Sequence, residues 1–278
     1  MSVKSNGGNL DREGEHGTTL FGSEQKQWQW SKIPGESCKI PNSKLLSLYA
    51  GPDGTLASRF SPNGLLLAVA QHSQVSVFSI PHGALVYYYN AHTGLIYSIT
   101  WYEDSKRFLT ASSDRTVCVW DLTQGRDPVW ILPHPCYVYD ALFLECSIIT
   151  CCYDGILRVW NCVSTSGTAD LTDELNGHKG YVNAICYNPV SGCLFSGDSR
   201  GVVIVWRLNE KTKRWCQART LLINGLQDIV INSLIIYGRS CLIVHSQDSV
   251  LRMIDATSGV VLQWYKVRKI IVFLLEQL

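Results

Sequence analysis

The 278-residue sequence lacks the short motifs that mark common catalytic sites. It contains no GxSxG nucleophile elbow, no GxGxxG or Walker phosphate loop, no HExxH zinc motif and no EF-hand loop. No apolar run approaches the roughly 18 residues that a membrane-spanning helix needs, and a formal net charge of +1 gives no field that would attract nucleic acid or anionic lipid. We therefore expect no enzyme activity, cofactor, metal site or small-molecule substrate, no transmembrane segment and no direct binding of nucleic acid.

Paired cysteine motifs and secretion signals are missing as well. The eleven cysteines are odd in number, form no CxxC pair and are scattered through apolar segments, and no N-x-Ser/Thr acceptor occurs. The first residues lack the apolar core of a secretory signal. This pattern favours reduced, buried thiols in a cytoplasmic protein. A disulfide framework is the less favoured alternative, and a zinc site is less favoured still.

The composition changes along the chain and predicts three parts. Residues 1–44 are rich in Gly, Ser, Glu, Lys and Gln without a sustained period, which predicts a disordered or partly docked leader. Across residues 45–262, short runs of Val, Ile, Leu and Tyr alternate with turn residues, as in a series of short strands. Residues 263–278 are apolar and match neither pattern, so we expect a separate tail.

Within the strand-rich part, one segment recurs five times. Each copy contains an apolar anchor, and the anchors are Phe78, Trp120, Trp160, Trp206 and Ile254. Their spacings of 42, 40, 46 and 48 residues are close to the length of a four-stranded propeller blade. The repeat therefore predicts a radial array of small antiparallel sheets.

Polar residues recur at fixed distances before three of the anchors. A histidine precedes each tryptophan by 26 to 28 residues, and a threonine or serine precedes it by ten. An aspartate lies six residues before two of the tryptophans. The full set is His92, Thr110, Asp114 and Trp120, then His134, Thr150, Asp154 and Trp160, then His178, Ser196 and Trp206.

This spacing resembles the Gly-His…Trp-Asp signature of the WD40 family over about residues 50–262. The resemblance implies an all-β fold: an incomplete WD40 β-propeller of about five blade units, which we expect to form an open arc. It also implies that the His, Ser/Thr, Asp and Trp of one blade are joined by hydrogen bonds. A His, a hydroxyl and an Asp could suggest a hydrolase. However, one active site does not recur every 40 residues, so we expect a structural role.

Two units depart from the pattern. Arg200 stands where the fourth unit should carry its aspartate, and Asp198, two residues earlier, is the expected substitute. The first unit has His72 at this place and no matching upstream histidine. We therefore expect packing to hold that unit.

Further stretches resemble the jouberin-type ciliary scaffold proteins, including "CKIPNSKLLSLYAG" (38–51) and "LPHPCYVYDALF" (132–143). This resemblance implies a protein-binding scaffold at the cilium base, in the transition zone or basal body, that supports cilium assembly. The implied partners are nephrocystin-type gate proteins and small-GTPase trafficking proteins. The alternative is a WD40 subunit of an RNA- or chromatin-associated complex.

Candidate partner-binding residues lie where the first strand of a blade begins. In the WD40 pattern, the loops before these strands line the narrow face of the propeller. The residues that we expect on this rim are Tyr97, Tyr139 and Asn183, with Arg115 and Arg200 in neighbouring turns. Tyrosine and arginine are enriched at interface hot spots. The alternative is that the tyrosines simply pack between blades.

Overall fold

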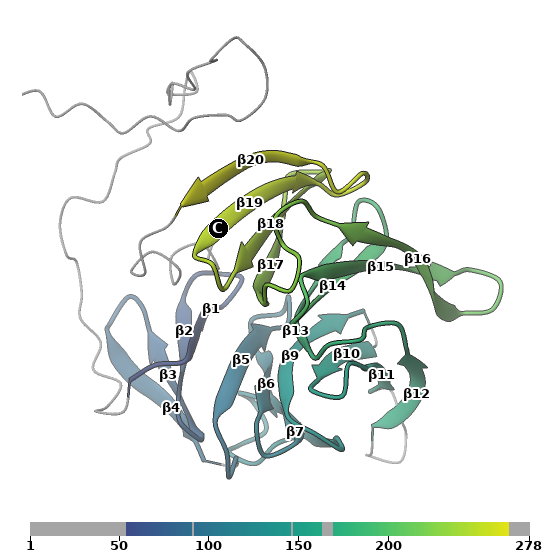
Figure 1. Cartoon of the computed structure of the whole chain (residues 1–278). Helices are drawn as coiled ribbons and strands as arrows, with labels where there is room; N and C mark the ends of the chain where they lie inside the picture. The colour runs from purple at the N-terminus through teal and green to yellow at the C-terminus, as the bar shows by residue number, and fades with distance from the viewer. Residues whose placement is uncertain (1–53, 91, 146, 163–168, 267–278) are drawn as a thin grey trace, which may run out of the picture. The chain divides into compact units, whose positions relative to one another are not determined.

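The computed structural model describes residues 54–90, 92–145, 147–162 and 169–266, all within the compact unit Lys44–Leu278. These residues form twenty β-strands and no helix (Figure 1). The predicted leader, residues 1–44, lies outside the described residues, as does most of the predicted tail. Strand β20 extends to Lys266, however, so residues 263–266 belong to the last blade and not to a tail. The all-β prediction is confirmed.

The strands form five four-stranded antiparallel sheets, each built from consecutive strands. Blade 1 consists of β1 (Ala57–Phe60), β2 (Leu66–Gln71), β3 (Gln74–Ser79) and β4 (Ala84–Tyr89). Blade 2 consists of β5 (Ile96–Trp101), β6 (Arg107–Ser112), β7 (Thr116–Asp121) and β8 (Trp130–Pro133). Blade 3 consists of β9 (Val138–Leu144), β10 (Ser147–Cys152), β11 (Leu157–Asn161) and β12 (Asp170–Leu175). Blade 4 consists of β13 (Val182–Asn188), β14 (Cys193–Asp198), β15 (Val202–Asn209) and β16 (Arg214–Leu222). Blade 5 consists of β17 (Ile231–Tyr237), β18 (Cys241–Ser246), β19 (Val250–Asp255) and β20 (Val261–Lys266).

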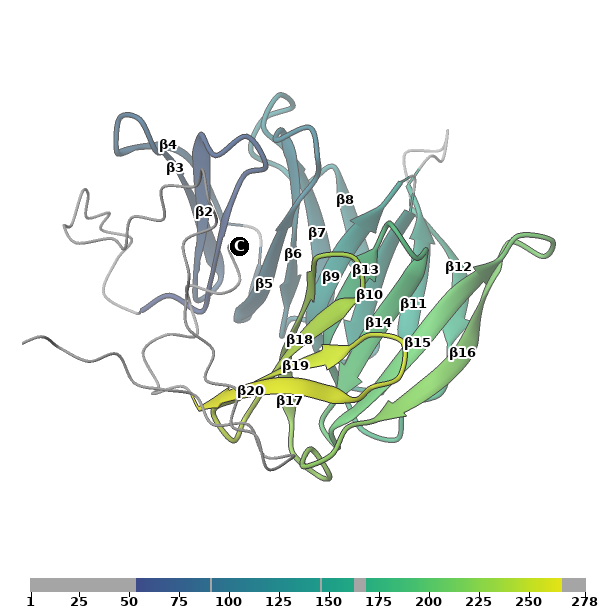
Figure 2. The same cartoon turned by 90° about the horizontal axis from the view of Figure 1, so that it is seen from above.

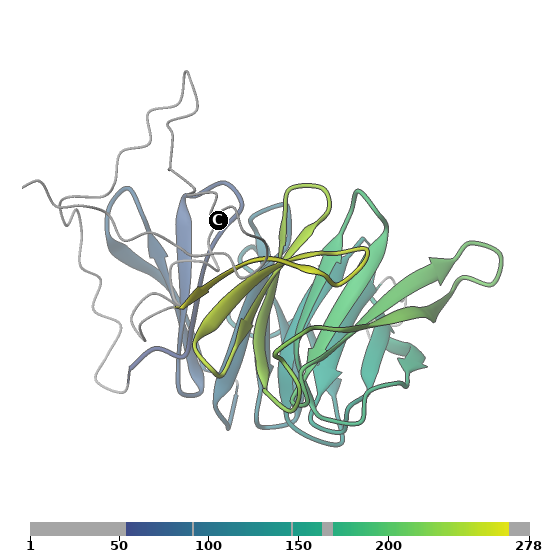
Figure 3. The same cartoon turned by 45° about the horizontal axis from the view of Figure 1, so that its top comes forward.

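The blades follow one another around a common axis and form a five-bladed β-propeller (Figures 1 and 2). The first strand of each blade is innermost and packs against the first strand of the next, in the order β1, β5, β9, β13, β17. Within the described ranges, no strand of blade 5 packs extensively against blade 1. The β15–β16 hairpin is the longest and projects outward (Figure 3).

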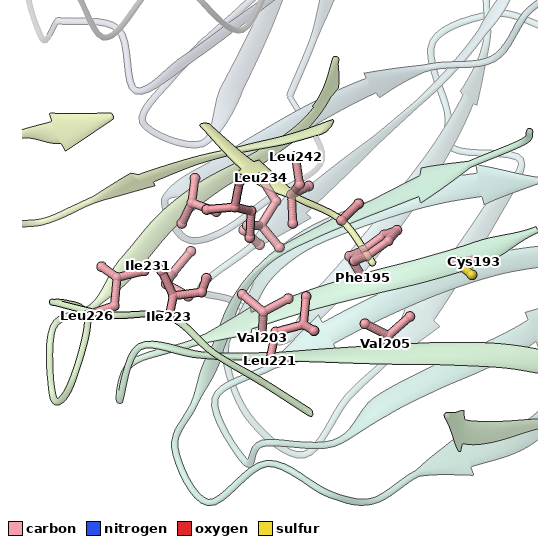
Figure 4. Packing of buried hydrophobic residues seen from close by; sticks show 14 residues of the cluster. Cys193, Phe195, Val203, Val205, Leu221, Ile223, Leu226, Ile231, Leu234 and Leu242 are labelled. Atoms are coloured by element: carbon pink, nitrogen blue, oxygen red, sulfur yellow. The ribbon is translucent and has the colours of Figure 1, made fainter. Parts of the chain in front are cut away.

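The hydrophobic core lies between the blades. Four buried clusters each join one blade to the next. Between blades 4 and 5, Phe195 and Val203 face Leu234 (Figure 4). Between blades 1 and 2, the ring of Tyr89 lies 4.8 Å from that of Trp120. Each blade therefore depends on its neighbour to bury its apolar face.

In blades 2 to 5, the turn between the second and third strands has its positive-φ residue three positions after the second strand ends, whereas the turn of blade 1 is shorter and has it at the first position. One residue of each turn is in the left-handed region, namely His72, Arg115, Gly155, Gly201 and Ser249. His72 is therefore a turn residue of blade 1. The cysteines that the structure describes are free thiols, so no described pair forms the disulfide alternative.

Gly201 provides a test of how tightly blade 4 meets the connection to blade 5. Its φ is +76°, and an added Cβ would overlap the carbonyl oxygen of Leu226. Gly64 has a similar φ of +70° but open space around it. We expect Gly64→Ala to lower the free energy of unfolding by about 1 kcal/mol through backbone strain alone. The clash should bring the loss for Gly201→Ala to about 3 kcal/mol or more. Urea denaturation measures both, and equal losses would contradict the packing described here.

Candidate functional site

Blade 2 contains a continuous hydrogen-bonded chain of four side chains. His92 Nδ1 lies 2.8 Å from Asp114 Oδ2, and His92 Nε2 lies 2.6 Å from the hydroxyl of Thr110. The indole N–H of Trp120 donates to the same hydroxyl oxygen at 3.0 Å. Because a carboxylate only accepts, the imidazole proton sits on Nδ1, and the Thr110 hydroxyl donates to Nε2. The structure thus brings together the four residues that the repeat pattern selects.

The Asp114 carboxylate has further donors. The Thr116 hydroxyl donates to Oδ1 at 2.6 Å, and the Thr93 N–H donates to Oδ2 at 3.0 Å. Burial by itself would raise the pKa of this carboxyl group, but the hydrogen bonds from His92 and Thr116 outweigh it and hold the pKa well below its usual range. Asp114 is therefore a satisfied anion.

Blade 4 reaches the same arrangement with a different aspartate. His178 Nδ1 lies 2.9 Å from Asp198 Oδ2, and Nε2 lies 2.6 Å from the Ser196 hydroxyl. Trp206 donates to that hydroxyl at 2.8 Å. Asp198 belongs to strand β14 and substitutes for the turn aspartate whose place Arg200 occupies. Hydrogen bonds from His178 and backbone N–H groups outweigh burial and lower the pKa of the Asp198 carboxyl group.

Blade 3 corrects the prediction for Asp154. His134 Nε2 does contact the Thr150 hydroxyl at 2.7 Å, and Trp160 donates to that hydroxyl at 3.2 Å. Asp154, however, accepts from Arg158 at 2.7 Å. His134 instead donates from Nδ1 to the carbonyl oxygen of Leu132, 3.0 Å away.

The cause of this change is the residue that pairs with the central hydroxyl across the sheet. In blade 2, Thr110 pairs with Cys118, whereas in blade 3 Thr150 pairs with Arg158. The Arg158 side chain is only 7% exposed, and its guanidinium needs acceptors. Arg158 donates to Asp154 and, at 2.9 Å, to Glu174. His134 therefore donates to a backbone carbonyl in place of Asp154.

In blade 5, as in blade 3, an arginine binds the turn aspartate. Arg252 donates to Asp248 at 2.7 Å and to the Ser246 hydroxyl at 2.8 Å. The sequence signal that we missed is an arginine four residues after the aspartate, which blades 3 and 5 share. Blade 1 has neither set among its described residues, and its anchor Phe78 is buried.

These polar chains have little capacity for catalysis. The hydroxyl-bearing residues at their centres, Thr110, Thr150 and Ser196, are 0% exposed. A nucleophilic hydroxyl must reach a substrate, and these three are enclosed between an indole and an imidazole. No group of three or more His, Cys, Asp or Glu in the described ranges could hold a metal ion.

The more accessible candidate site is a cluster of tyrosines, here called the tyrosine rim. It consists of Tyr97, Tyr137, Tyr139, Tyr153 and Tyr181. The ring centroids of Tyr97 and Tyr139 are 5.0 Å apart, and those of Tyr139 and Tyr181 are 5.7 Å apart. Tyr153 stacks on Tyr181 at 5.2 Å with an interplanar angle of 10°. The rim therefore joins blades 2, 3 and 4.

Bulges in the innermost strands position the predicted members of this site. The register between first and second strands shifts at Tyr97, Tyr139 and Asn183. A bulge re-aims the side chain of the extra residue. Burial, followed by the neighbouring phenols, raises the pKa of Tyr139 to about 12, and this ring also packs on the core between blades 3 and 4. The packing alternative thus holds in part for Tyr139.

The open side of the rim comes from residues that the sequence reasoning missed. Tyr137 and Tyr153 are 49% and 51% exposed, and their rings are 6.2 Å apart. Tyr137 and Tyr181 immediately precede β9 and β13, and Tyr153 lies in the β10–β11 turn. Only the folding of consecutive blades brings these segments together.

The other predicted rim residues lie around the tyrosines. The side-chain oxygen of Asn183 is buried and has no hydrogen-bond partner. Arg115 is exposed, and its carbonyl accepts from the N–H of His134. Arg200 Nε lies 3.6 Å from Asp228, and both residues line a cavity of about 490 Å³ between blade 4 and the connection to blade 5.

Comparisons with known proteins agree with the fold. Residues 83–121 and 169–207 match the WD domain, G-beta repeat (WD40) family, and each matched segment ends one residue after a tryptophan anchor. These two segments of the chain are therefore WD40 repeats. No helix among the described residues has the length and apolarity to cross a membrane.

The chain is similar in particular to jouberin. It is 31% identical to jouberin of Mus musculus and 30% identical to jouberin of Rattus norvegicus, in each case over 83% of this chain and 24% of the relative. It is 27% identical to the WD repeat and FYVE domain-containing protein 2 of Caenorhabditis elegans, over 45% of this chain and 21% of the relative. The chain thus spans about a quarter of the length of the jouberins that it matches.

Removing the carboxylate of Asp114 tests the polar chain of blade 2. We expect Asp114→Ala to lower the free energy of unfolding by about 1–3 kcal/mol, because His92 and Thr116 lose a buried acceptor. Asp127→Ala, at an exposed loop position, is the control and should change stability by less than about 0.5 kcal/mol. Partner binding should fall only as far as the folded fraction falls. An unchanged melting curve together with a lost activity would contradict the structural role.

The buried imidazole of blade 3 predicts a pH dependence. Burial lowers the pKa of His134 to about 4 from the usual 6.5. Between these values the unfolded chain binds a proton that the folded chain does not, so stability falls as the pH drops through this window. From pH 7 to pH 5, the wild type should lose about 1–2 kcal/mol more than His134→Gln. Parallel losses in urea titrations at the two pH values would contradict a buried, neutral His134.

Proposed function

We propose that this chain is a non-enzymatic scaffold whose blades hold one another in place and whose tyrosine rim receives a protein partner. The observation that carries the proposal is the rim itself, where five aromatic side chains from three blades adjoin and two of them are half exposed. Tyrosines supply large contact areas at a low cost in side-chain entropy. Because neighbouring rings already restrain one another, little ordering is left for binding to impose.

The proposal excludes hydrolysis by the His–hydroxyl–Asp sets. Their hydroxyl groups are fully buried, and the sets recur with different acids in blades 2 and 4. Asp154 is engaged with Arg158 in blade 3, which leaves His134 without a carboxylate. A catalytic triad requires a constant geometry around an accessible nucleophile, whereas a structural network only requires that each buried polar group be satisfied.

For the cellular role, we propose a jouberin-like function at the cilium base, in the transition zone or basal body, in support of cilium assembly. The likeness to the two jouberins supports this proposal. Nephrocystin-type gate proteins and small-GTPase trafficking proteins are the proposed partners. Similarity of fold alone would not support so specific a role.

The test is proximity labelling of the tagged chain in ciliated cells. We expect enrichment at the ciliary base and recovery of transition-zone proteins. The double variant Tyr137→Ser/Tyr153→Ser should lose at least one recovered partner while it keeps the wild-type melting temperature. Tyr237→Ser is the matched control, because Tyr237 is 60% exposed but lies on blade 5, outside the rim.

Two results would contradict the proposal. A diffuse or chromatin-bound signal without ciliary partners would favour the RNA- or chromatin-associated alternative. Recovery of the same partners by the wild type, the double variant and the control would show that the rim is not the binding surface.

A further inference from the structure

We propose that the tyrosine rim recognises a proline-rich segment in the polyproline II conformation that carries acidic residues. This inference rests on the proposed role of the rim as a partner-binding surface and names the chemistry of the partner. Three features of the described residues support it: the arrangement of the rings, the free polar atoms beside them and the charges of the surrounding turns.

The rings form a cluster of adjoining aromatic surfaces, in which Tyr139, Tyr153 and Tyr181 are mutual neighbours, with Tyr139 and Tyr153 6.4 Å apart. Successive centroids lie 5.0 Å apart from Tyr97 to Tyr139, 5.7 Å from Tyr139 to Tyr181 and 5.2 Å from Tyr181 to Tyr153. Tyr137 extends the cluster a further 6.2 Å from Tyr153. Polyproline II segments are extended protein ligands whose repeating proline rings pack on aromatic side chains.

The polar atoms of the rim are available to a ligand. The side chains of Tyr137 and Tyr153 are about half exposed, and the buried side-chain oxygen of Asn183 has no hydrogen-bond partner. A polyproline II segment has no internal hydrogen bonds, so its carbonyl oxygens are free to accept from phenols. In a helix, by contrast, most carbonyl groups are already paired.

A partner that adds a β-strand is less suited to this place. Such a partner needs free backbone N–H groups on a strand edge. The innermost edge of β13 is occupied near the rim, because the N–H of Ile185 donates to Asp140 Oδ2 at 3.1 Å. The rim therefore presents aromatic rings and hydroxyls, whereas an added β-strand would need free backbone N–H and C=O groups.

The charges around the rim favour acidic residues in the partner. Asp114 and Asp154 are already bound by their own blades. Arg115 and Lys179 lie in the segments next to the rim, are exposed and form no ion pair with a described residue. A cationic partner would meet uncompensated positive charge, whereas an acidic one would be attracted.

The experiment is selection from a phage-displayed library of random 12-residue peptides against the immobilised full chain. Phage that also bind Tyr137→Ala/Tyr153→Ala are removed, and the most enriched peptide is measured by fluorescence anisotropy. We expect enriched sequences with several prolines and a net negative charge. Binding should weaken at least tenfold when alanines replace the prolines, and at least tenfold in the double tyrosine variant.

Variants that separate ring from hydroxyl complete the test. Tyr153→Phe should retain more affinity than Tyr153→Ala, because it keeps the stacking surface. Tyr237→Ala should bind the peptide as the wild type does. Circular dichroism melts of every variant exclude loss of folding.

Selection of rim-dependent sequences without proline enrichment, or no rim-dependent sequence at all, would overturn the proposal. So would a peptide whose affinity is unchanged by replacement of its prolines. The proposed scaffold function is tested separately, by proximity labelling, and is contradicted when the cellular partners do not depend on the rim. Rim-dependent cellular partners whose binding segments lack proline would remove only the further inference.

Discussion

The structure depends on the burial of apolar side chains between blades. A four-stranded sheet has two faces, and in this chain the buried clusters lie where one blade meets the next. Neither partner could exclude water from those side chains alone. Close contact leaves little room at the blade boundaries, where polar groups must find partners within the protein. The hydrogen-bonded chains and the placement of the rim follow from this constraint.

Each polar chain provides hydrogen-bond partners for buried polar groups, but the blades use different residues to do so. Blade 2 uses a turn aspartate, Asp114, to hold its histidine, and blade 4 uses a strand aspartate, Asp198. In blades 3 and 5, Arg158 and Arg252 bind the turn aspartate instead. The shared feature is a carboxylate that accepts from a nearby donor. The donor can be an imidazole, as in blades 2 and 4, or a guanidinium, as in blades 3 and 5. Such exchangeability is expected of a support and not of a catalytic centre.

The blades could be predicted from the sequence because the residues that mark each blade lie close together in the chain. The spacing of anchors such as Trp120 and Trp206 reports one repeat at a time, and the residues of the blade 2 chain lie at fixed offsets from the anchor. Contacts across the sheet were less visible. Arg158 takes Asp154 because it pairs with Thr150, and that register is not apparent in the repeat alignment. The stacking of Tyr153 on Tyr181 requires two blades to be placed side by side.

The central claim is that the histidines of the three polar chains, His92, His134 and His178, are fixed structural donors and not bases. In all three, the acceptor beside Nδ1 is an aspartate or a backbone carbonyl, which places the ring proton on that nitrogen. Long-range ¹H–¹⁵N NMR of the imidazoles measures this state directly. The account predicts a protonated Nδ1 in His92, His134 and His178 at neutral pH, unchanged when a partner binds. An unprotonated Nδ1 in these residues, or a tautomer that switches on binding, would contradict it.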